Sequence, residues 1–278
     1  MEYLNKIALA ATLAAASLTA AQATTLAATD FAFTGVNGNT TLGGWSFVSF
    51  VDISAGTTIY FTDTNVLQTT PSAGVFSTSA ETFWSWTAGA NVAAGTSVAL
   101  LGTGVSGQYG AKSGAAGGST NGTVTNLNGG ASNISSGGDI LYAYQAASYA
   151  TNYAPSAITF LGALANRTTP YASSDNPFAA TGLSGIQVRE YRVDAATATR
   201  YTQFTPQTTT SDTPYGSMAA LKSALAVSAN WTTVAASNTL PIVADVLAVT
   251  AVPEPESYAL LLAGLGVVGA VARRRQLA

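Results

Sequence analysis

The chain has 278 residues, enough for one large domain or two small ones, and it contains neither cysteine nor histidine. This composition excludes disulfide scaffolds, Cys/His zinc sites, thiol nucleophiles and every catalytic triad that uses a histidine base. Charged residues make up 8% of the chain and its net charge is −3. Between Thr24 and Val252 the lysines and arginines are scattered, so we expect no nucleic-acid partner.

The N-terminus has the organisation of a secretory signal sequence. Lys6 precedes an apolar, alanine-rich run, and Ala21 and Ala23 place small residues at the two positions that signal peptidase reads. We therefore expect residues 1–23 to be a signal peptide, exported through the Sec machinery and removed by signal peptidase, so that the mature chain starts at Thr24. The alternative is an alanine-rich helix that belongs to the fold.

The body, residues 24–245, has the pattern of strands and turns. Residues 45–53 are rich in aromatic and β-branched side chains, which predicts a strand, and the chain resumes as a strand at 58–63 after a turn. Segments 52–59 and 91–98 follow one template. With two copies, this predicts the same strand-turn-strand unit used twice and not a solenoid.

The middle of the body changes composition sharply. Residues 81–89 alternate, which places Trp84 and Trp86 on one face of a strand, and we expect that face to lie in the core. Residues 102–138 then hold 12 glycines in 37 positions. Because such a stretch buries little apolar surface, we expect a long surface loop there.

The second half of the body alternates again and contains a helix. Ser217 is placed to cap a helix over 218–227, in which Met218, Leu221 and Leu225 form one apolar stripe, and Trp231 is expected to fold back on that stripe. Strands are expected at 139–145, 157–164 and 185–194.

The C-terminus has three parts in a fixed order. A linker over 246–257 contains Pro253, Glu254 and Pro255, an uncharged apolar helix is expected over 258–272, and a basic tail over 273–278 begins with Arg273, Arg274 and Arg275. A helix of 15 residues spans about 22 Å, short of the roughly 30 Å hydrocarbon core of a bilayer. An ordinary tail anchor remains the alternative, with the arginines at the cytoplasmic face.

This order of motif, apolar helix and arginines resembles the PEP-CTERM sorting signal of Gram-negative bacteria. The resemblance implies that exosortase, a membrane-embedded cysteine protease, is a partner that recognises Pro253, Glu254 and Pro255. It further implies that 258–272 is the hydrophobic helix and that the arginines are the stop. The expected route is an inner-membrane intermediate, followed by the cell surface or the exterior.

The body is similar to lamin-tail-like domains of secreted bacterial proteins. The residues that carry this resemblance are 31–38, 50–63, 137–145, 215–216 and 229–231. The resemblance implies an all-β fold, an immunoglobulin-like sandwich of two antiparallel sheets, with one short helix in its C-terminal half. Such domains serve mostly as adhesive or interaction modules.

Few side chains of the body suggest chemistry. Asp63, Thr64 and Asn65, with Asp52 nearby, are either oxygen ligands for calcium or turn caps. We assign no catalytic, cofactor-binding or metal-binding residue.

The sequence predicts an exported, non-enzymatic protein of the surface or extracellular matrix, associated with biofilm exopolysaccharide. The alternatives are a secreted carbohydrate-active hydrolase using a carboxylate pair and a calcium-dependent, lectin-like binding module.

Overall fold

The computed structural model divides the chain into two units, Met1–Ala248 and Val249–Ala278. It describes residues 22–38, 43–63, 67–68, 75–76, 82–114, 118–130, 134, 140–147, 158–167, 178, 181–192, 200–204, 215–235, 244–248 and 264–265.

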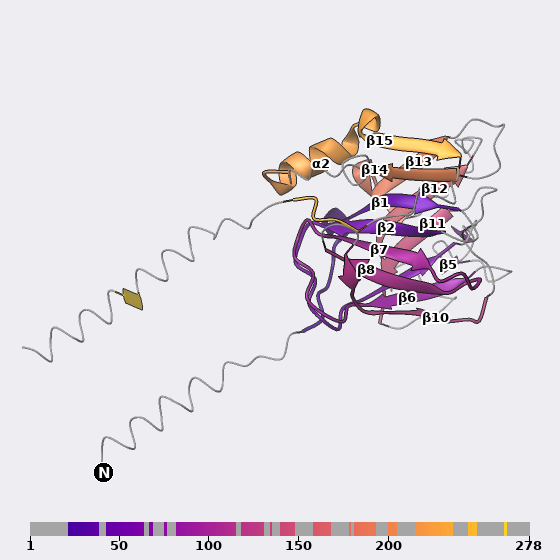
Figure 1. Cartoon of the computed structure of the whole chain (residues 1–278), viewed down its shortest axis with the longest axis horizontal. Coiled ribbons are helices and arrows are strands. Elements are labelled where there is room, and N and C mark those ends of the chain that lie inside the picture. Colours follow the sequence, from indigo (N-terminus) through magenta and orange to yellow (C-terminus); the bar gives the residue numbers. More distant parts are fainter. Residues whose placement is uncertain are drawn as a thin grey trace, which may run out of the picture. The chain divides into compact units, whose positions relative to one another are not determined.

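The first unit contains a seven-stranded sheet, here called sheet 1 (Figure 1). Every neighbouring pair in it is antiparallel. Its strands, in spatial order, are β15 (Trp231–Ala235), β14 (Arg200–Phe204), β1 (Phe31–Asn37), β2 (Gly44–Ser49), β7 (Ser97–Gly102), β8 (Tyr109–Ser113) and β9 (Ser119–Thr120).

Sheet 2 has six strands and lies against sheet 1. Its neighbours are antiparallel except for β12 and β13, which run parallel. Its order is β10 (Thr123–Asn126), β6 (Phe83–Thr87), β3 (Thr58–Thr62), β11 (Ile140–Gln145), β12 (Thr159–Arg167) and β13 (Val188–Arg192). Two short strands, β4 (Leu67–Gln68) and β5 (Val75–Phe76), pair separately. The all-β sandwich expected from the sequence is confirmed.

The main core fills the space between the sheets. Because side chains alternate along a strand, each strand sends every second residue inward. Trp84 and Trp86 are fully buried, which confirms that their shared face is core. Across the sheets, the Trp45 and Trp84 rings lie 5.3 Å apart and Phe47 packs edge-on against Trp86 at 5.5 Å.

Strands β11 and β12 are buried on both faces. Leu141 belongs to the core between the sheets, whereas Tyr142 belongs to a second apolar cluster on the outer face of sheet 2. Phe76 of β5 covers that outer face, with its ring 4.9 Å from the Tyr144 ring and 5.8 Å from the Phe160 ring. This double burial explains why β11 is apolar at consecutive positions.

The expectation of a long surface loop over 102–138 is wrong for the described part of that stretch. Strands β8, β9 and β10 lie within it, and Tyr109 and Ala111 of β8 are buried. Glycine supplies the positive φ that the tight turns need, as at Gly122 (φ +84°). Backbone carbonyls of the same stretch also accept hydrogen bonds from the core, since Trp84 Nε1 donates to Gly107 O at 2.9 Å.

The helix α2 (Met218–Ala226) forms where the sequence predicts one. Ser217 Oγ accepts a hydrogen bond from the Ala220 N–H, which confirms the N-cap. Leu221 and Leu225 are buried, and Trp231 Nε1 donates to the Leu225 carbonyl at 3.0 Å, so the tryptophan does fold back on the helix. Single-turn 3₁₀ helices are η1 (Ala28–Asp30), η5 (Gly185–Gln187) and η7 (Ser228–Asn230).

In the second unit the structure describes Gly264 and Leu265, both helical and exposed. The rest of the expected helix over 258–272 lies outside the described residues. Within the described part of the chain, no helix has the length and apolar character to cross a membrane.

Candidate processing sites at the ends of the body

The two copies of the sequence template form two of the crossings between the sheets. Segment 52–57 leads from β2 in sheet 1 to β3 in sheet 2, and segment 91–96 leads from β6 in sheet 2 back to β7 in sheet 1. Each turns at a glycine with positive φ, Gly56 (+84°) and Gly95 (+80°). The template therefore does recur as one structural solution. We call these two segments the turn pair.

The two copies bind each other reciprocally. Ile53 and Val92 exchange both backbone hydrogen bonds at 2.8 Å. The Asp52 side chain accepts from the Ala94 N–H at 2.8 Å, and the Asn91 side chain accepts from the Ala55 N–H at 2.9 Å. Residues at equivalent positions thus cap each other's turns, as in a local two-fold arrangement.

The acidic residues considered for calcium serve as backbone caps. Asp52 caps the turn at Ala94, and the buried Asp63 accepts a hydrogen bond from the Thr82 N–H at 2.7 Å. Both contacts match the turn-cap interpretation of these side chains. Thr64 and Asn65 lie outside the described residues.

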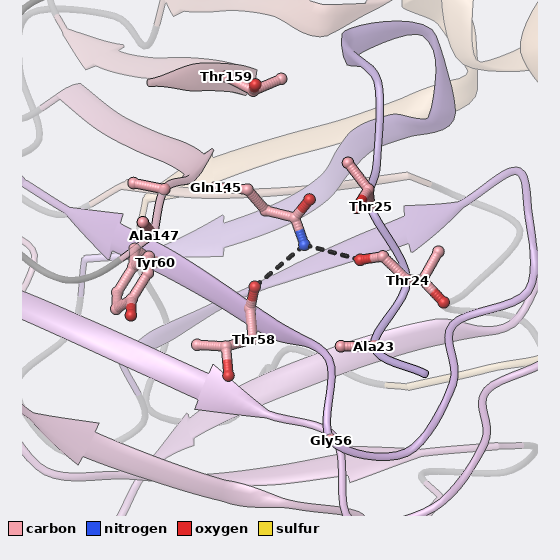
Figure 2. Close-up of a pocket in the computed structure, with 10 residues that line it drawn as sticks. Ala23, Thr24, Thr25, Gly56, Thr58, Tyr60, Gln145, Ala147 and Thr159 are labelled. Carbon is pink, nitrogen blue, oxygen red and sulfur yellow. Dashed lines mark hydrogen bonds between the residues drawn. The ribbon is translucent and has the colours of Figure 1, made fainter. Parts of the chain in front are cut away.

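The N-terminal end of the body docks on the first copy of the turn pair. The Thr24 N–H donates to Thr57 Oγ1 at 2.7 Å, and the Thr24 hydroxyl accepts from the Ser54 N–H at 2.9 Å. Gln145, at the end of β11, donates to the carbonyls of Thr24 and Thr58, both at 3.1 Å (Figure 2). Nothing local in the sequence indicates this role of Gln145, since Thr24 lies 121 residues away.

A pocket of about 470 Å³ opens beside this contact. Ten residues line it, and none of them carries a charged side chain: Ala23, Thr24, Thr25, Gly56, Thr58, Tyr60, Gln145, Ala146, Ala147 and Thr159. The Gln145 amide at its wall is occupied by the body itself, because its oxygen accepts from the Leu26 N–H at 2.8 Å and its nitrogen makes the two bonds above. The polar side chain of Gln145 in this pocket therefore holds the first residues of the body in place. Of the two predicted cleavage-site residues, Ala23 is exposed at this pocket, and Ala21 lies outside the described residues.

The C-terminal end of the body docks on the second copy. The Ser97 N–H donates to the Asp245 carbonyl and the Asp245 N–H donates to Ser97 Oγ, both at 2.8 Å. The Leu247 N–H donates to the Gly95 carbonyl at 2.8 Å. Residues 245–248 thus belong to the body, and both ends of the body are fastened to the turn pair.

The tail residues singled out by the sequence follow this second contact along the chain. Pro253, Glu254, Pro255 and Arg273–Arg275 are outside the described residues, but they fall within 251–276, which match the family model of the PEP-CTERM protein-sorting motif. The tail is a PEP-CTERM sorting motif. This finding supports exosortase as the processing partner, with export to the cell surface or the exterior as the outcome. No curated protein and no solved structure matches the chain.

Proposed function

We propose that this exosortase substrate is a non-enzymatic β-sandwich module of the cell surface or the extracellular matrix, associated there with biofilm exopolysaccharide. The observation that carries the proposal is the PEP-CTERM motif over 251–276, which follows directly after a β-sandwich body. The resemblance of the body to lamin-tail-like domains favours an interaction module. The absence of histidine and cysteine from the sequence removes the commonest catalytic bases and nucleophiles.

The proposed route has two cleavages. The leader over 1–23 directs the chain through the Sec machinery, and signal peptidase removes it after Ala23. The apolar segment 258–272 then holds the chain as an inner-membrane intermediate, with Arg273–Arg275 on the cytoplasmic side. Exosortase cuts near Pro253–Glu254–Pro255 and releases the body to the exterior.

The molecular role is tested by incubating the processed protein with exopolysaccharide from the producing cells. We expect the protein to sediment with the polysaccharide and to release no reducing sugar. Release of reducing sugar would overturn the non-enzymatic assignment and favour a hydrolase. Failure to sediment with the polysaccharide would overturn the proposed association, and loss of sedimentation on chelation would favour the calcium-dependent module.

A further inference from the structure

Thr24, the residue that follows the predicted signal-peptide cleavage point, is held by the folded body through all of its polar groups. Its N–H donates to Thr57 Oγ1, and its carbonyl accepts from Gln145 Nε2. Its hydroxyl accepts from the Ser54 N–H and donates to the Asp52 carbonyl at 3.3 Å. The nitrogen of the predicted scissile bond, Ala23–Thr24, is therefore part of the docking contact.

The residues after Thr24 strengthen this attachment. Leu26 is 1% exposed in the core between the sheets, and its N–H donates to Gln145 Oε1. Gln145 also donates to the Thr58 carbonyl, so one amide side chain joins β11, β3 and the start of the body. Because Gln145 is 121 residues from Thr24, this contact requires the folded body and cannot form within the N-terminal segment alone.

A peptidase binds its substrate as an extended segment whose main-chain groups pair with the enzyme. In the folded body the main-chain groups of Thr24 are already paired. We propose that signal peptidase cuts Ala23–Thr24 before the N-terminal segment docks, and that in a precursor which docks uncut the bond is closed to the enzyme. This inference rests on the proposed export route. It adds an order of events, in which folding of the body sets the time limit for removing the leader.

The cleavage itself adds one water across the bond. The Ala23 carbon–Thr24 nitrogen bond breaks, the hydroxyl of water goes to the Ala23 carboxyl group, and a hydrogen goes to the Thr24 nitrogen. The new α-amino group, with an ordinary pKa of about 7.7–8.0, takes up a further proton below that pH. An amine in the place of the Thr24 amide nitrogen retains a donor for Thr57 Oγ1, so the processed chain docks as the precursor does.

The test uses the full-length chain, synthesised without membranes in detergent, with signal peptidase either present during synthesis or added after folding. We expect complete cleavage in the first arm and cleavage at least about tenfold slower in the second, because the bond is exposed only by local opening. Gln145→Ala is expected to restore most of the rate in the folded precursor. Gln187→Ala, in η5, removes a glutamine that takes no part in docking Thr24 and is expected to leave the rate unchanged.

Thr57→Val serves as a second loosening variant if Gln145→Ala does not fold, since it replaces the acceptor hydroxyl by a methyl group of similar size. Intact mass identifies the bond that is cut. Equal rates in the two arms, no cleavage in either arm, or cleavage at another bond would overturn the inference. In the producing cells, loss of surface location with the leader still removed at Ala23–Thr24 would instead count against the proposed function.

Discussion

Gly95 is a residue of the turn pair against which the body's C-terminal end packs closely. A Cβ atom there would lie 2.7 Å from the Ala248 carbonyl oxygen and 2.8 Å from Met218 Cε, whereas a Cβ at Gly56 would meet open space. Both glycines have positive φ, so alanine costs about 1–2 kcal/mol of backbone strain at either position. Gly56→Ala is therefore a matched control for Gly95→Ala.

We expect Gly95→Ala to lower the free energy of unfolding by at least about 1 kcal/mol more than Gly56→Ala, because it also displaces Ala248. Urea unfolding of the two variants and the parent measures this difference. Equal losses would show that Ala248 does not pack on the turn pair.

Tyr201 makes the free energy of unfolding vary with pH in the alkaline range. Burial raises the pKa of Tyr201 from 10.0 to about 12, and its hydroxyl donates to Gln203 Oε1 at 2.8 Å. Since the folded state keeps a proton that the unfolded chain loses, this contribution is fully present below pH 10 and is lost as the pH rises from 10 to about 12.

Tyr201→Phe removes both the proton and the hydrogen bond, so we expect it to be less stable than the parent by about 1 kcal/mol below pH 10. The gap in melting temperature between parent and variant is expected to close as the pH rises from 10 to about 12. A gap that stays constant over this range would contradict the burial of a neutral Tyr201.

Single-residue roles could be predicted from the sequence where the partner lies within a few positions. The Ser217 side chain caps its helix at the N–H of Ala220, three residues ahead, and the Trp231 side chain donates to the carbonyl of Leu225, six residues back. The role of Gln145 had no such signal, because its partners Thr24 and Leu26 lie before β1 of sheet 1 and meet it only when the two sheets pack together.

Among the elements, the turn pair couples two of the crossings between the sheets. Asp52 and Asn91 each cap the opposite copy, so removing either cap loosens the segment that presents the other. We expect Asp52→Ala and Asn91→Ala each to cost about 0.5–1.5 kcal/mol. The double variant is expected to cost less than the sum, with a coupling of at least about 0.5 kcal/mol.

Urea unfolding of the parent, both single variants and the double variant measures this coupling energy as a double-mutant cycle. Strict additivity would mean that the two crossings are independent, despite the hydrogen bonds between Ile53 and Val92.

The recurrence of the template was visible in the sequence. The pairing of its two copies was not, because nothing in either copy specifies the other as its partner.

Strand positions could be predicted from alternation, but several strand ends could not. The strand expected over 45–53 stops at Ser49, where the hydroxyl donates to the Val51 carbonyl at 2.7 Å and bends the chain. The strand expected over 185–194 begins at Val188, after a 3₁₀ turn that starts at Gly185 with φ +60°. In the stretch 102–138, low apolar content hid β8, β9 and β10, and the turns beside them accept hydrogen bonds from the core tryptophans through the Gly107 and Asn121 carbonyls.

In the whole molecule, both ends of the body are fastened to the turn pair, and the predicted cleavage points lie just outside these contacts in the sequence. Thr24 is the first docked residue at one end, and Leu247 and Ala248 are docked at the other, shortly before the sorting motif begins at residue 251. The PEP-CTERM motif could be recognised from the sequence because its three parts are contiguous. The docking of the body's ends could not, because it depends on contacts between distant segments.

We expect the chain to be cut at both ends and delivered outside the cell. The most direct test is the intact mass of the native protein combined with fractionation of the cells, with a chain lacking residues 253–278 as the control. We predict an extracellular or surface protein that begins at Thr24 and ends near Pro253–Pro255, and a control that loses this location. A native protein that keeps residues 1–23 or the intact tail, or a control with unchanged location, would contradict the account.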